Sequence, residues 1–178
     1  MSGDVVTIVI VGALILAALI VAGYYLLRFL RGRIKIRLPK YAFNTGEKVT
    51  GTFDLKIRKP IEGNRLYAAL IGEEEIRERR GDKTRTHRNE VFRNEQTLEQ
   101  SKSFIAGWSQ RYNFELSTPS AQEPDFLNSS LGKTLKMGIE LLSNTRRRLQ
   151  WKVVVRLDAK GIDLASKKSI SVNMSDAI

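Results

Sequence analysis

The chain opens with an apolar stretch, Val5 to Leu27, that contains no charged residue. A helix rises about 1.5 Å per residue, so a helix of this length would cross a hydrocarbon core of roughly 30 Å. Basic residues gather directly after the stretch, whereas only Asp4 precedes it, and basic residues beside a span stay on the cytoplasmic side. A cleaved signal peptide is not favoured, because the first residues carry no positive side chain and the apolar stretch is long. The pattern predicts a single transmembrane helix with its N-terminus outside and a cytoplasmic C-terminal domain.

After this stretch, apolar and polar residues alternate with a period of two, which is typical of strands with one buried face. The alternation runs through Ile34–Leu38, Val49–Ile57, Tyr112–Leu116 and Trp151–Leu157. Residues 65–72 are apolar on both faces, as expected of a central strand. Short strands joined by turns predict a mainly β fold, an antiparallel immunoglobulin-like β-sandwich.

One segment departs from the strand pattern and predicts an inserted helix at about residues 125–144. Pro124 and Asp125 suit a helix start, and apolar residues then recur at helical spacing. The arginines at 146–148 would face the negative end of the helix dipole. Two interpretations stay open: the apolar stripe covers one end of the sandwich, or the helix docks on a membrane surface or a partner.

These patterns divide the chain into five parts. They are an N-terminal tail at 1–4, a transmembrane helix at 5–27, a basic juxtamembrane segment at 28–33, the sandwich domain at 34–173 and a C-terminal tail at 174–178.

The net charge of +11 favours anionic partners. The sequence has no familiar nucleic-acid-binding motif and no aromatic-basic stacking pattern, so anionic lipid headgroups are favoured over nucleic acid. Other proteins, integral membrane subunits among them, are the second expected class of partner. The sequence leaves the oligomeric state open and is compatible with a homo-oligomer.

Two basic clusters are predicted to contact the membrane surface or a partner. They comprise Arg28, Arg31, Arg33 and Lys35 beside the apolar stretch, and Arg79, Arg80, Lys83, Arg85 and Arg88 in a predicted loop at 79–89. Two interpretations of the loop stay open: a solvated hairpin tip, or a contact for anionic lipid or an acidic partner.

The sequence predicts no enzyme, no metal site and no cofactor. There is no cysteine, and His87 is the single histidine, so neither a metal cluster nor a nucleophile–base pair has its usual partners. The consecutive carboxylates at 73–75 would alternate sides on a strand and pair with neighbouring arginines. Phosphate-binding glycine loops are absent, and no Ser-x-x-Lys lies in a nucleophile context.

Three stretches resemble the N-terminal domain of the arrestin family. Residues 41–51 followed by 66–72 are similar to its opening pattern of an aromatic, Gly-Glu-x-Val-x-Gly and a strand that ends in glycine. Residues 112–119 resemble its aromatic strand running into a proline, and 149–157 with 167–172 resemble its closing strands. The chain has room for one sandwich where the family usually carries two. Nothing in it resembles the charged polar core or the C-terminal tail of the signalling arrestins.

The resemblance implies an adaptor or scaffold without catalysis. Combined with the predicted span, it gives a membrane-anchored scaffold that presents an arrestin-like sandwich to protein partners at the cytoplasmic membrane surface. The alternative is a small accessory subunit of a larger integral membrane protein complex.

Overall fold

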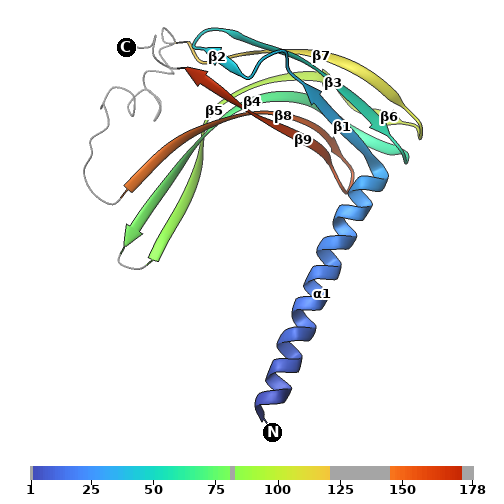
Figure 1. Cartoon of the computed structure of the whole chain (residues 1–178). Helices are drawn as coiled ribbons and strands as arrows, with labels where there is room; N and C mark the ends of the chain where they lie inside the picture. The colour runs from blue at the N-terminus through green and yellow to red at the C-terminus, as the bar shows by residue number, and fades with distance from the viewer. Residues whose placement is uncertain (1, 81–82, 121–144, 174–178) are drawn as a thin grey trace.

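The computed structural model describes residues 2–80, 83–120 and 145–173 (Figure 1). The single helix of this described part, α1, spans Ser2–Arg31. The strands that follow are β1 (Gly32–Arg37), β2 (Ala42–Asn44), β3 (Lys48–Ile57), β4 (Ile61–Arg80), β5 (Lys83–Glu99), β6 (Lys102–Phe104), β7 (Ser109–Ser117), β8 (Thr145–Ala159) and β9 (Leu164–Asn173). The predicted helix at 125–144 lies outside the described residues.

The described strands form two sheets that face each other. One sheet has the order β1-β3-β7, and the other has the order β2-β9-β8-β4-β5, with β6 pairing with β4. The predicted antiparallel arrangement holds for every described pair apart from β2 and β9, which run parallel. After β1 the chain leaves the small sheet, and the next strand, β2, joins the edge of the large sheet beside β9. This crossing between the sheets produces the parallel pair.

The core lies between the two sheets and is built from the alternating positions of the sequence. Ile34 and Ile36 of β1 are buried, while the residues between and beside them are exposed. Phe53 of β3 is fully buried and stacks on Tyr112 of β7, with ring centroids 5.3 Å apart and planes 16° apart. The ring of Phe114 also lies beside that of Phe53, with ring centroids 6.4 Å apart. The predicted inward faces of the strands are therefore confirmed.

Tyr112 joins this core to a polar partner and gives a pH-dependent prediction. Its hydroxyl donates to Oε1 of Glu99 at 3.1 Å. Burial, and then the nearby Glu99 carboxylate, raise the pKa of Tyr112 to about 12. A raised folded-state pKa means that the neutral phenol is favoured on folding, so its contribution to stability is complete below pH of about 10 and is lost as the pH rises towards 12.

We expect one tyrosine of the native protein to ionise last, with a midpoint near the raised value. The tyrosinate absorbance of the wild type, compared with that of Tyr112→Phe, isolates this transition. A difference titration centred near the ordinary tyrosine value of about 10 would contradict the prediction.

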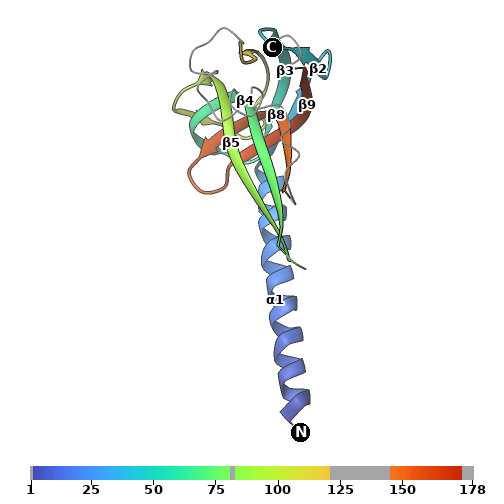
Figure 2. The same cartoon turned by 90° about the vertical axis from the view of Figure 1, so that its left-hand side faces the viewer.

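The junction between α1 and β1 is held by backbone and arginine hydrogen bonds. Nη1 of Arg31 donates to the carbonyl oxygens of Lys160 at 3.2 Å and Ile162 at 3.0 Å, which lie in the turn between β8 and β9. The backbone N–H of Arg58 donates to the Arg31 carbonyl oxygen at 2.8 Å. Its guanidinium lies over the ring of Phe29, 4.1 Å from the centroid. These contacts fix the base of the helix, which then projects away from the sandwich (Figures 1 and 2).

The predicted membrane span is contradicted by the structure. Within the part of the chain that the structure describes, no helix combines the length and apolar character needed to cross a membrane. The transmembrane helix and the predicted single-pass localisation, with an outside N-terminus and a cytoplasmic domain, are corrected accordingly.

Candidate functional site

Three strands of the large sheet continue beyond the core as a projecting ribbon. The ribbon consists of residues 73–80 of β4, 83–90 of β5 and 145–150 of β8, with β4 in the centre. Glu75 of β4 lies opposite Arg88 on one side and Arg148 on the other. The ribbon extends to the same side of the sandwich as α1, and the two are well separated (Figure 1).

The apolar core ends where the ribbon begins. Trp151 of β8 packs edge-on against Phe92 of β5, with ring centroids 5.5 Å apart. Gly72 lies against this tryptophan, and a Cβ at Gly72 would come within 2.9 Å of the indole ring. The pairing of β4 with β5 shifts register directly after Gly72. Beyond this point mainly polar side chains replace the core residues on both faces, so the ribbon rests on strand pairing and on ion pairs.

Two of the carboxylates at 73–75, Glu73 and Glu75, pair with basic residues, as the sequence predicts. Nε of Arg77 donates to Glu75 at 2.6 Å and Nε of Arg88 donates to it at 3.1 Å, and only 4% of the Glu75 side chain is exposed. The hydrogen bond from Arg77, and then that from Arg88, lower the pKa of Glu75 below its usual range. Nζ of Lys152 donates to Glu73 at 2.5 Å. Glu75 and Glu73 therefore join β4 to its two neighbouring strands, β5 and β8.

The described residues hold no metal site, because no group of three His, Cys, Asp or Glu side chains among them could bind an ion. His87 is exposed and lies on β5 opposite Ile76, within the segment that the sequence predicts to be a loop. The predicted loop at 79–89 is likewise strand for most of its length, since β4 runs to Arg80 and β5 begins at Lys83.

The predicted contact residues fall in different places. Arg33 and Lys35 are exposed on β1, and Arg85 and Arg88 are exposed on the ribbon. Arg31 is engaged at the base of α1, as described above. The backbones of Arg28, Arg79, Arg80 and Lys83 lie in α1 and the ribbon, whereas their side chains are not among those described.

A groove opens beside the ribbon, where β8 and β9 diverge. Its volume is about 800 Å³. Four cations line it, drawn from three strands: Arg88 of β5, Arg148 and Lys152 of β8, and Lys167 of β9. Among the described residues, the single carboxylate that lines it is Glu73, which Lys152 already binds. The groove is thus an electropositive site.

Sequence reasoning missed three of these cations: Arg148, Lys152 and Lys167. The arginines at 146–148 were expected at the end of a helix, but β8 begins at Thr145 and carries them in strand conformation. The alternation from Trp151 to Leu157 did place Lys152 on the polar face. Nothing local in the sequence shows that this face meets Arg88 and Lys167.

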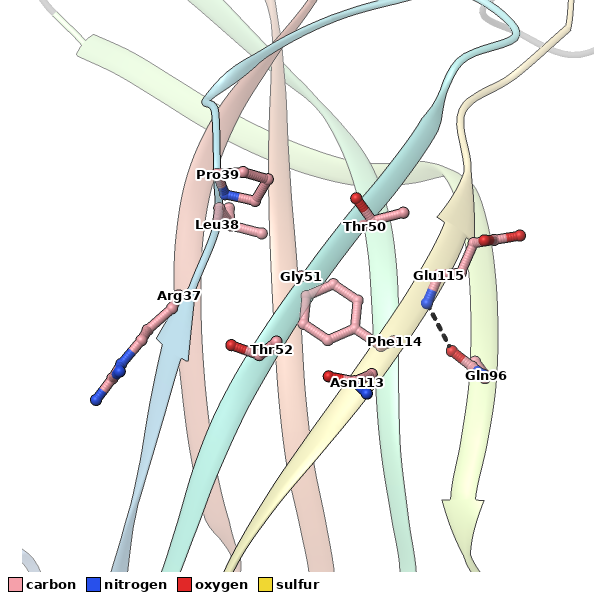
Figure 3. Close-up of a pocket in the computed structure, with 10 residues that line it drawn as sticks. All are labelled: Arg37, Leu38, Pro39, Thr50, Gly51, Thr52, Gln96, Asn113, Phe114 and Glu115. Atoms are coloured by element: carbon pink, nitrogen blue, oxygen red, sulfur yellow. Dashed lines mark hydrogen bonds between the residues drawn. The ribbon is translucent and has the colours of Figure 1, made fainter.

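A second cavity of about 640 Å³ lies on the small sheet (Figure 3). Its two charged lining residues, Arg37 and Glu115, form ion pairs with Asp54 at 2.8 Å and with Lys48 at 2.6 Å. On one side the backbone N–H of Glu115 donates to Oε1 of Gln96 at 2.9 Å, so a side chain of β5 covers the edge of β7 (Figure 3).

Comparison with known proteins supports the fold. No family model matches the chain, and no curated protein matches it in sequence. Among solved structures, the chain is similar to the crystal structure of Spo0M, a sporulation control protein from Bacillus subtilis, with a TM-score of 0.54 and 16% sequence identity. The match covers 80% of this chain, which spans about half (49%) of that protein. At this identity the likeness concerns the fold alone, and it supports the arrestin-like β-sandwich that the sequence motifs predict.

Proposed function

We propose that this protein is a non-catalytic adaptor that presents an arrestin-like sandwich to protein partners through its projecting ribbon. The observation that carries the proposal is the ribbon itself, which extends beyond the core and exposes the side chains of Arg77, Arg85, Arg88 and Arg148. The ribbon contributes little to the apolar core, against which its Leu149 packs. Its cations and its main-chain edges are the groups that a partner would recognise.

The electrostatics of the ribbon fit this role. The Glu75 side chain is nearly fully buried and forms ion pairs with Arg77 and Arg88. The two arginine side chains nevertheless stay more than half exposed, at 58% and 65%. Arginine presents several donors in a fixed plane and is well suited to carboxylates of a partner. A preordered cation also loses less side-chain entropy on binding than a free one.

The test compares two matched double variants in affinity capture with the full chain. Arg85→Ser with Arg88→Ser removes ribbon cations, whereas Lys56→Ser with Lys59→Ser removes two exposed cations at the end of β3 and just beyond it, far from the ribbon in the strand order. We expect the ribbon variant to retain about tenfold less of the principal partner, because it loses two charged contacts of about 0.7 kcal/mol each, and the control to match the wild type. Equal recovery by both variants would refute the proposed role of the ribbon.

A second candidate is an accessory subunit of a larger protein complex. It is favoured by α1, whose large apolar side chains are exposed all along the described helix, Ile8 to 69% and Leu14 to 65% among them. Exposed apolar surface of this extent marks an interaction site in other proteins. In the same capture experiment, a stoichiometric partner that both double variants retain in full would favour the accessory subunit over the adaptor.

A further inference from the structure

The groove beside the ribbon has an unpaired strand edge as one wall. β8 pairs with β9 from Leu157 opposite Leu164 as far as Trp151 opposite Ile170. Beyond that point β9 turns to β2, where Ser171 lies opposite Ala42, and β8 continues with β4 alone. Within the described residues, the edge of β8 from Thr145 to Gln150 therefore has no strand beside it on the side away from β4. Backbone N–H and C=O groups along such an edge can accept another strand.

The side chains around this edge set the charge of what could bind there. Arg148 and Lys167 line the groove and are exposed, and neither forms an ion pair with any described residue. Arg88 and Lys152 keep further positive charge nearby although each is paired with a glutamate. The groove thus offers two cations whose charge is not neutralised within the described protein.

The same charges disfavour a second copy of this chain as the occupant. The protein carries a net charge of +11, so the strands of a second copy would bring like charges into an electropositive groove. An extended segment with carboxylates on one face would complement it. Side chains alternate along a strand, so carboxylates at every second position would point to the same side and could reach Arg148 and Lys167.

We propose that an acidic peptide segment of a partner adds to the edge of β8 at 145–150, with its carboxylates bound by Arg148 and Lys167. This deepens the proposed adaptor function and rests on it. Main-chain hydrogen bonds along the edge provide affinity, and the two cations select acidic over neutral or basic sequences.

The test uses the full-length chain and a labelled peptide of alternating glutamate and valine, with binding followed by fluorescence anisotropy. Two comparison peptides have lysine in place of every glutamate, or proline in place of the central valine. We expect the acidic peptide to bind, the lysine peptide not to bind, and the proline peptide to lose binding because proline removes a main-chain donor and interrupts strand pairing.

The groove variant is Arg148→Ser with Lys167→Ser, and the control is again Lys56→Ser with Lys59→Ser. We expect the groove variant to weaken binding about tenfold or more and the control to change it less than about twofold. Circular dichroism establishes that both variants are folded.

Several results would overturn the proposal. They are equal weakening by both variants, undiminished binding of the proline peptide, or self-association that removes peptide binding. Variant-sensitive binding to phosphatidylserine vesicles without any peptide binding would assign the cations to a lipid surface. If partner capture depends on Arg85 and Arg88 but not on Arg148 and Lys167, the adaptor function stands and the groove proposal fails.

Discussion

Replacing Phe53 by alanine is expected to lower the free energy of unfolding by about 3–5 kcal/mol, the range for a buried aromatic residue. Phe53 has no exposed surface and lies at the centre of the core, between the rings of Tyr112 and Phe114. Its removal loses the burial of the ring and the stacking contact, and it leaves a cavity that rigid strands on both sides cannot close. Urea unfolding followed by circular dichroism measures the change.

Tyr41→Ala is the matched control for Phe53→Ala. Tyr41 is 52% exposed, and its backbone carbonyl accepts a hydrogen bond from the N–H of Ser171, which the substitution keeps. We expect it to change stability by no more than about 0.5 kcal/mol. Similar losses for the two variants would show that Phe53 does not lie in a packed core between the sheets.

Gly32→Ala is the second change with a large expected effect, a loss of about 1–3 kcal/mol or more. Gly32 begins β1 and lies opposite Ile57 of β3. A Cβ there would lie 2.4 Å from the carbonyl oxygen of Lys56 and 2.9 Å from Cδ1 of Leu164. The first of these atoms belongs to a paired strand, so relief of the clash must separate β1 from β3 where α1 joins the sandwich.

A second glycine-to-alanine change separates this clash from the general effect of adding a methyl group. At Gly12 of α1 an added Cβ would meet nothing within 4 Å apart from the helix backbone. Alanine favours a helix over glycine by about 1 kcal/mol, so Gly12→Ala should leave the thermal unfolding midpoint unchanged or raise it. If Gly32→Ala had the midpoint of the wild type, the close approach of β1 and β3 at this position would be contradicted.

The sandwich could be predicted from the sequence because its strands carry their burial in a local pattern. The alternation at Ile34 and Ile36 fixes which face of β1 is buried, and the same holds for β3, β7 and β8. A period of two needs only neighbouring residues to be recognised. The predicted membrane span came from hydropathy in the same local manner, and there the structure contradicts it.

The ribbon could not be predicted because long-range pairing creates it. Glu75 and Arg148 are far apart in the sequence, and no local pattern states that they lie opposite each other. The arginines at 146–148 follow residues with helical spacing, so they were assigned to a helix end. Gly81 and Asp82 favoured a loop at 79–89, but strand pairing extends to Arg80 and Lys83. The groove depends on the same pairing, and its cations come from three separate strands.

The proposed function therefore depends on a surface that only the folded chain assembles. Arg85 and Arg88 were already predicted as contacts from their clustering, whereas Arg148 and Lys167 enter through the paths of β8 and β9. If the adaptor function is right, partners should respond first to the charge of the ribbon and then to the edge of β8.

The most direct test of the central claim locates the partner by cross-linking. The chain contains no cysteine, so Arg85→Cys and Lys59→Cys each provide a single attachment site for a thiol-reactive, photoactivatable cross-linker. Position 85 lies on the ribbon, and position 59 lies away from it. The account predicts that the captured partner cross-links efficiently from position 85 and not from position 59. Cross-linking from position 59 with none from position 85 would contradict it.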